Sequence, residues 1–224
     1  MGEAVRRKVG RPIENTDIRE RLLFQAGELF TAMPYDKVST RLLAEKAGVN
    51  VAMIRYYFAN KEGLFEAMVR DTMQPVQEKI RQLLDESSQQ GLIEVMRAYY
   101  RTMAQSPRFP KLMLQVMSMG PMDERRVLLE KIFMESAKPA LDLIFDRMLE
   151  NGEIRSGMEP ILCRFTFVSL MVFPFIAPNA MLNFHGVEIN ETFLNRLLEH
   201  NINVLKQGFL EPEQPTSLEL KNEN

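Results

Sequence analysis

A cation and two phenols stand together at Arg55, Tyr56 and Tyr57. They follow the segment Val51–Met53, whose side chains are small or unbranched. If this stretch is helical, the helix is narrow at its start and carries its polar groups further along. Such a helix can enter the major groove of DNA, where side chains reach the edges of bases. The stretch is therefore the first candidate for a functional site.

The residues before this stretch predict two short helices joined by a tight turn. Ser39 is a good N-cap for the first helix, and Gly48 ends it because glycine adopts the left-handed conformation without strain. The second helix starts near Val51, and Ile54 and Phe58 share one face because they are four residues apart. This spacing predicts a helix-turn-helix, although the same pattern also occurs in plain packing units.

Other chemistry-bearing residues are sparse. The sequence has two histidines, His185 and His200, and one cysteine, Cys163. They show no zinc-ligand spacing, and the chain has neither a phosphate-binding glycine loop nor a Gly-x-Ser-x-Gly motif. We therefore expect no enzymatic activity, no metal and no cofactor, with Cys163 acting as a small hydrophobic residue.

Methionine and phenylalanine are abundant, with 16 and 14 copies among 224 residues. Flexible methionines suit an adaptable cavity for a hydrophobic ligand, although methionine at helical spacing is also common in an ordinary core. The candidate ligand-binding residues are Met96, Tyr99, Tyr100, Met103, Met113 and Met117, with Met119 and Met122 close by.

The elements that position these residues are all helical, because no stretch alternates with the period of a strand. We expect an all-α fold of about nine helices. The first begins near Thr16 or Asp17, and the fourth follows Asn60 and continues past Pro75. A long helix runs from about Asp123 to Asn151, and the last two start near Pro160 and Asn190.

Composition and charge narrow the class of protein. Residues 1–70 hold 12 Lys and Arg against 9 Asp and Glu, a surplus of +3, whereas the whole chain carries −2. A single cysteine and no apolar region in the charged segment Met1–Lys8 favour a cytoplasmic protein. Residues 165–182 hold no charge, but Pro174 and Pro178 interrupt them, so we expect this segment to be buried within protein rather than in a membrane.

The motif itself resembles a known family. Leu-Ala-Glu-Lys-Ala-Gly-Val at 43–49, Ile-Arg-Tyr-Tyr-Phe at 54–58 and Asn-Lys-Glu-Gly-Leu at 60–64 are similar to the signature of the TetR/AcrR family of bacterial transcriptional regulators. The resemblance extends upstream to Ala26, Leu29 and Phe30. Ala52 replaces a frequent glycine, and Arg55 replaces a frequent tyrosine.

The resemblance implies that residues after the cap face bases and that residues one turn later face phosphates. The DNA-binding candidates are Arg11, Thr40, Asn50, Val51, Ala52, Met53, Arg55, Tyr56, Tyr57 and Lys61. Because the side chains of residues 51–53 offer no hydrogen bond, Arg55 must read most of the polar base edges. The basic segment before residue 16 is expected to be a flexible arm that reaches the minor groove.

Two C-terminal segments suggest an interface. The apolar candidates are Phe165, Leu194, Leu197, Leu198, Ile202 and Leu205. They either form the core of their own domain or pair with a second copy, and the resemblance favours a four-helix interface in a homodimer.

These observations predict an arm at 1–15, a helix-turn-helix DNA-binding domain at 16–60, a helical ligand-binding and dimerisation domain at 61–210, and a disordered tail at 211–224. The expected function is that of a repressor that binds double-stranded DNA at a palindromic operator and is released by a small hydrophobic ligand. The alternative is an all-α enzyme or carrier that uses the Met/Phe-rich cavity.

Overall fold

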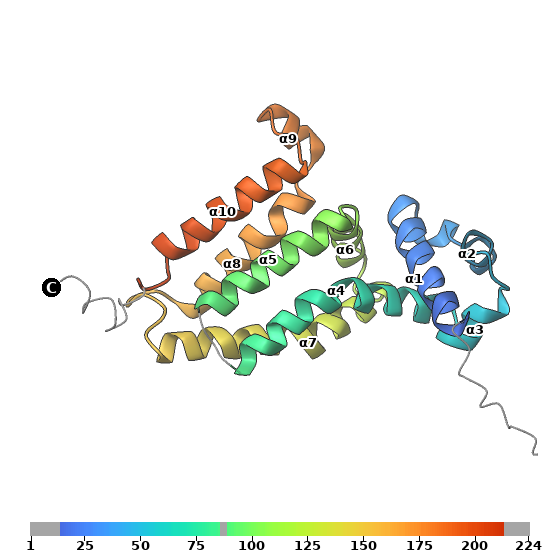
Figure 1. Cartoon of the computed structure of the whole chain (residues 1–224), viewed down its shortest axis with the longest axis horizontal. Helices are drawn as coiled ribbons and strands as arrows, with labels where there is room; N and C mark the ends of the chain where they lie inside the picture. The colour runs from blue at the N-terminus through green and yellow to red at the C-terminus, as the bar shows by residue number, and fades with distance from the viewer. Residues whose placement is uncertain (1–13, 86–88, 213–224) are drawn as a thin grey trace, which may run out of the picture. The chain divides into compact units, whose positions relative to one another are not determined.

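A computed structural model describes residues 14–85 and 89–212 of the chain. The chain divides into two compact units, residues 1–71 and 72–224. Within the described ranges it is all-α, with ten α-helices and one short 3-10 helix, and the strand-like pairing there is an isolated bridge between Ile154 and Leu210 (Figure 1). No helix of these ranges is long and apolar enough to cross a membrane.

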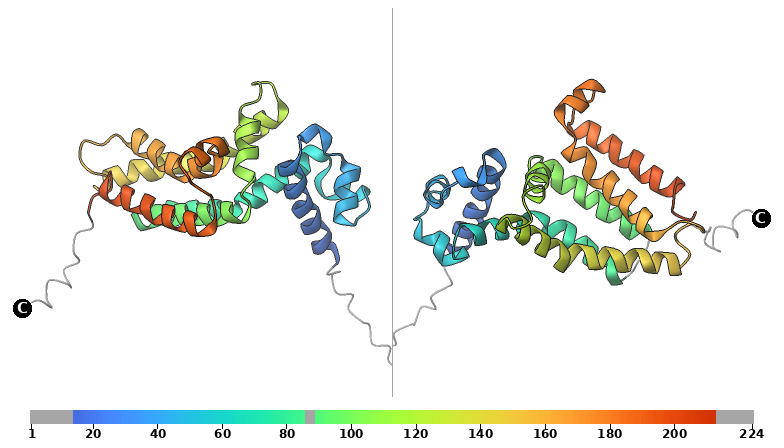
Figure 2. Two further views of the ribbon diagram at one scale, coloured as in Figure 1. Left: turned by 90° about the horizontal axis from the view of Figure 1, so that it is seen from above. Right: turned by 180° about the vertical axis from the view of Figure 1, so that it is seen from behind.

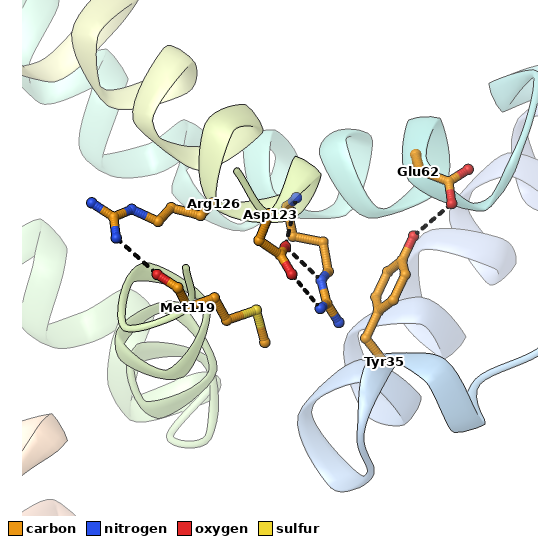
Figure 3. A network of polar contacts seen from close by, with 6 residues as sticks. Tyr35, Glu62, Met119, Asp123 and Arg126 are labelled. Carbon is orange, nitrogen blue, oxygen red and sulfur yellow. Dashed lines mark hydrogen bonds and ion pairs between the residues drawn. The ribbon is translucent and has the colours of Figure 1, made fainter. Parts of the chain in front are cut away.

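The first unit contains α1 (Glu14–Ala32), η1 (Tyr35–Lys37), α2 (Thr40–Ala47), α3 (Ala52–Phe58) and the start of α4 (Lys61–Asp85). Its core includes three aromatic rings, since the centroid of Phe30 lies 5.1 Å from that of Tyr35 and 5.2 Å from that of Phe65. Tyr35 also donates a hydrogen bond of 3.2 Å to Glu62 (Figure 3). These contacts pack α1, η1 and the start of α4 against one another.

The start of α1 corrects one expectation. The helix begins at Glu14, two residues before Thr16, so Glu14 and Asn15 are helical and do not belong to an arm. The sequence masked this start because the apolar repeat begins only at Ile18. Residues 1–13, which include Arg11 and the rest of the basic arm, lie outside the described residues, and so does most of the expected C-terminal tail.

The second unit contains α5 (Gln89–Gln105), α6 (Phe109–Met117), α7 (Glu124–Glu150), α8 (Pro160–Ile176), α9 (Asn179–Phe184) and α10 (Glu191–Gln207). Helix α8 packs on α7, α6 and α5, while α10 packs on α5 (Figure 2). Asp123 caps α7 by accepting from the backbone N–H of Arg125 at 3.0 Å, and hydrogen bonds from the Arg125 side chain help lower the pKa of this carboxyl to about 2 (Figure 3).

Helix α9 is the element that we did not predict, so the expected number of nine helices was too low for the described ranges. It follows Pro178 and buries none of its residues. A helix without a buried face leaves no apolar repeat in the sequence, which explains the miss.

A backbone carbonyl that a proline leaves without its helical hydrogen bond connects three helices of this unit. Pro174 lies inside α8 and has no N–H, so it cannot bond the carbonyl of Leu170, four residues earlier. The Tyr100 hydroxyl donates to this carbonyl at 3.0 Å, and Asn201 Nδ2 donates to it at 3.1 Å. Asn201 Nδ2 also donates to the Tyr100 hydroxyl at 2.9 Å. Side chains of α5 and α10 thus satisfy the backbone of α8, and burial raises the pKa of Tyr100 to about 12.

Candidate nucleic-acid interface

The turn between α2 and α3 is fixed by local hydrogen bonds. Ser39 Oγ accepts from the N–H of Leu42 at 3.1 Å and so caps α2, as predicted. Gly48 adopts φ 63° and ψ 38°, and its N–H bonds back to the carbonyls of Ala44 and Glu45. This left-handed conformation suits glycine and directs the chain into α3.

Helix α3 has two distinct faces. Ile54 is only 1% exposed, and Phe58 is also buried, so both anchor the helix in the core of the first unit. Tyr56 is 72% exposed, and Arg55 lies exposed beside it. The division follows the predicted spacing of four residues and leaves the polar face open to a partner.

The tip of α3 is ordered by Asn50. Its Oδ1 atom accepts from the N–H of Ala52 at 2.9 Å, which satisfies one of the free amides at the start of the helix. Val51 and Ala52 are exposed, and Met53 is half-buried. The tip therefore presents small apolar groups over a satisfied backbone.

The exit from α3 is equally constrained. Asn60 Oδ1 accepts from the N–H of Gly63 at 2.7 Å and caps α4. A Cβ atom at Gly63 would lie 2.0 Å from the carbonyl oxygen of Phe58, a distance that no side chain tolerates. Glycine at this position lets the start of α4 pass close to the end of α3.

The predicted DNA-binding cations differ in their surroundings. The Arg55 guanidinium has no hydrogen bond or ion pair within the described ranges. Lys61 is engaged, because its Nζ donates to the carbonyls of Tyr35 at 3.3 Å and Val38 at 3.2 Å and lies 4.0 Å from the centre of the Tyr35 ring. Lys61 thus holds the segment before α2 in place.

The remaining candidates lie around these cations. Thr40 is the first residue of α2 and is half-buried. Tyr57 is half-buried, with its ring centroid 4.8 Å from that of Tyr56. Arg41 is exposed next to Thr40, and our sequence analysis did not name it. The sequence did contain a signal for Arg41, because it is a cation in the first turn of α2, the helix that precedes α3.

A comparison with family models identifies this unit. Residues 22–68 match the model described as "Bacterial regulatory proteins, tetR family". The match spans the helix-turn-helix with its caps and the helices on both sides of it. Residues 22–68 thus form a tetR-family unit. No sequence among curated proteins is a significant match.

Solved structures share the fold of the chain as a whole. The fatty acid degradation regulator FadR from Bacillus halodurans matches with a TM-score of 0.66 and 17% identity, over 84% of this chain and 98% of that one. NalD, the secondary repressor of the MexAB-OprM multidrug efflux pump in Pseudomonas aeruginosa, matches with a TM-score of 0.63 and 18% identity, over 90% of this chain and 100% of that one. A SmeT–triclosan complex matches with a TM-score of 0.65 and 16% identity, over 90% of this chain and 96% of that one.

The predicted ligand-binding residues lie inside the second unit. Five of them are buried, namely Met96, Tyr99, Tyr100, Met103 and Met113, while Met117 is half-buried. Burial raises the pKa of Tyr99. Met122, which is close to them in the sequence, is 90% exposed and so lies outside this buried cluster. A groove of about 650 Å³ between α5 and α10 includes Tyr100 but none of the other five.

The predicted interface residues need a larger correction. Four of them, Leu194, Leu198, Ile202 and Leu205, are buried within their own unit and leave too little exposed surface for an interface with a second copy. The apolar stripe correctly indicated that these residues are buried, but the sequence does not show which helix covers them. Leu197 is half-buried, whereas Phe165 is 74% exposed.

Phe165 belongs to an apolar outer face of α8. Ile161, Leu162 and Phe173 are also exposed there, opposite the buried Phe167. Residues 165–182 were expected to be buried within protein, and this face of α8 is not covered by the chain itself. Exposed apolar side chains gathered on one helix favour a protein interface.

Proposed function

We propose that this chain is a cytoplasmic repressor of the tetR family that binds a palindromic operator as a homodimer and is released by a hydrophobic small molecule. The observation that carries the proposal is the outer face of α3, where Arg55 has no partner within the described ranges. A helix anchored by Ile54 and Phe58 presents this face rigidly, as recognition of base edges requires.

Base reading is assigned to the start of α3. Val51, Ala52 and Met53 offer only apolar contact, chiefly to thymine methyl groups, whereas Arg55 can bond O6 and N7 of guanine. We assign Thr40, Tyr56, Tyr57 and Lys61 to the DNA backbone, with Asn50 ordering the tip. Arg41 joins this group because it is an exposed cation beside Thr40. Lys61 has one N–H left for a phosphate, since two are used by carbonyls of the chain.

Dimerisation is assigned to the outer face of α8 instead of the α10 stripe. A two-fold axis would pair the exposed Leu162, Phe165 and Phe173 with the same residues of a second copy. Two copies related in this way carry two α3 helices, and each reads one half of a palindrome.

Ligand release follows from linkage. A ligand that binds more tightly to the conformation with lower DNA affinity must weaken operator binding, and DNA must weaken ligand binding by the same factor. A hydrophobic ligand is supported by the many buried methionines and by the fold shared with a protein solved as a triclosan complex.

Selection from a random pool of double-stranded DNA tests this function. We expect the full chain to enrich an inverted repeat and to run as a dimer in light scattering. Phe165→Glu should give monomers that lose the operator, while Gln74→Glu, an equal charge at an exposed position of α4 away from this face, serves as the control. The proposal fails if no inverted repeat is enriched, or if Phe165→Glu remains a DNA-binding dimer.

A further inference from the structure

The groove between α5 and α10 lies apart from the predicted methionine cluster. Its volume of about 650 Å³ falls within the range of small-molecule sites, which is roughly 300 to 1,000 Å³. One wall comes from the C-terminal half of α5 and the other from the N-terminal half of α10 and the segment just before it. Both walls belong to the second unit, so the groove is a feature of one folded body.

The two arginines of the groove differ in their partners. Arg97 makes a two-pronged ion pair across the groove with Glu199, with N–O distances of 2.6 and 3.3 Å. Arg101 lies one turn further along α5, is exposed, and has no hydrogen bond or ion pair among the residues that the structure describes. The charge of Arg97 is therefore matched within the chain, and Arg101 is the cation left for an anion. The other charged wall residue, Glu191, lies at the start of α10.

The rest of the wall combines apolar side chains with the polar groups of Gln105, Asn190 and Asn195. Leu194 and Leu198 project from α10, with Ala104 and Pro107 on the side of α5. Both leucines are buried, so their side chains are set by the packing of α10 on α5 and are not free to collapse into the groove. A ligand that fills the groove would cover this apolar surface and meet two charges that are unpaired among the described residues, Arg101 on the side of α5 and Glu191 at the start of α10.

We propose that this groove binds a small amphiphile, with its single anionic head group on Arg101 and its apolar part against Leu194 and Leu198. The inference deepens the proposed ligand control, because it names a site and a ligand class, and it rests on the proposed function only for its effect on DNA. A bound carboxylate on a guanidinium gains charge-assisted hydrogen bonds, while the apolar part gains by leaving water.

The groove also touches the bonds that join three helices. Tyr100 forms part of its wall, and the Tyr100 hydroxyl donates to the carbonyl of Leu170 that Pro174 leaves without a backbone partner. A ligand against Tyr100 therefore contacts the hydrogen bonds that hold α5, α8 and α10 together. Because α8 carries the exposed apolar face, occupation of the groove has a direct route to the proposed dimer interface.

Calorimetric titration of the full chain with octanoate and with 1-octanol tests the site. The two probes share an apolar tail and differ in head-group charge. We expect octanoate to bind more tightly, and Arg101→Gln to weaken octanoate by about tenfold while leaving 1-octanol unchanged. Ala104→Phe fills the groove and should weaken both probes. Arg196→Gln removes the same charge from an exposed position of α10 outside the groove and should change neither.

The two groove variants, Arg101→Gln and Ala104→Phe, are expected to leave the fold intact. Arg101 and Ala104 are exposed, so both variants should fold, which thermal unfolding followed by circular dichroism verifies. The proposal is overturned if octanoate fails to bind the wild type, or if it binds Arg101→Gln as well as the wild type. Operator affinity is measured separately with and without octanoate. Octanoate that binds through Arg101 without weakening DNA binding keeps the site and removes ligand release from the proposed function.

Discussion

Helices α3 and α8 each bury one face and expose the other, but what they expose differs. The outer face of α3 carries Arg55 and Tyr56, groups that water solvates well. The outer face of α8 carries Phe165 and Phe173, and leaving them in water costs about 25 cal/mol for each Å² of apolar area. The outer face of α3 is therefore stable in water without a bound polyanion, whereas the outer face of α8 favours a permanent apolar partner. This difference supports the proposal that α3 reads DNA and that α8 pairs with a second copy.

The largest expected effect separates the two faces of α8. Phe167 is fully buried, so Phe167→Ala should lower the free energy of unfolding by about 3 to 5 kcal/mol through lost burial and a cavity. Phe165→Ala should instead make stability depend more strongly on protein concentration, because it weakens association and not the core. Urea unfolding at several protein concentrations distinguishes them. Equal, concentration-independent losses for both variants would break the comparison.

The same division should hold in α3. We expect Ile54→Ala to destabilise the first unit by about 2 to 5 kcal/mol, since its side chain is buried among the helices of that unit. Tyr56→Ala, two residues along, should change stability by less than about 0.5 kcal/mol and still weaken DNA binding. Thermal unfolding and operator titration of the two variants measure both effects. A stability loss for Tyr56→Ala as large as that for Ile54→Ala would show that Tyr56 contributes to the core and does not belong to a free outer face of α3.

A smaller effect tests the inner side of α8 through its backbone. Tyr100→Phe should cost about 1 kcal/mol, because the Leu170 carbonyl loses one of its two donors. In a Pro174→Ala background the restored N–H supplies that bond, so Tyr100→Phe should cost measurably less. A double-mutant cycle in urea gives the coupling. Strict additivity would show that the proline and the tyrosine do not share this carbonyl.

The sequence predicted what local patterns determine. Ser39 and Gly48 bound α2 because capping and left-handed turns depend on nearby residues, and the all-α fold followed from helical periodicity. It failed where the answer depends on distant packing. The stripe of Leu198 and its neighbours signalled burial but not its partner, and no spacing relates Tyr100 and Asn201 to the carbonyl that Pro174 frees. Lys61 shows the same limit, since its bonds to carbonyls 23 and 26 residues away follow from the fold alone.

The central claim is that Arg55 reads a base from the outer face of α3. Its most direct test is the affinity of the wild type and Arg55→Ala for a set of operator variants that change one base pair at a time. We predict that Arg55→Ala costs about 1 to 3 kcal/mol on the native operator and relaxes preference at one guanine in each half-site. Arg41→Ala, the control cation on α2, should weaken all variants alike. A uniform loss for Arg55→Ala across every variant would place Arg55 on a phosphate and contradict the account.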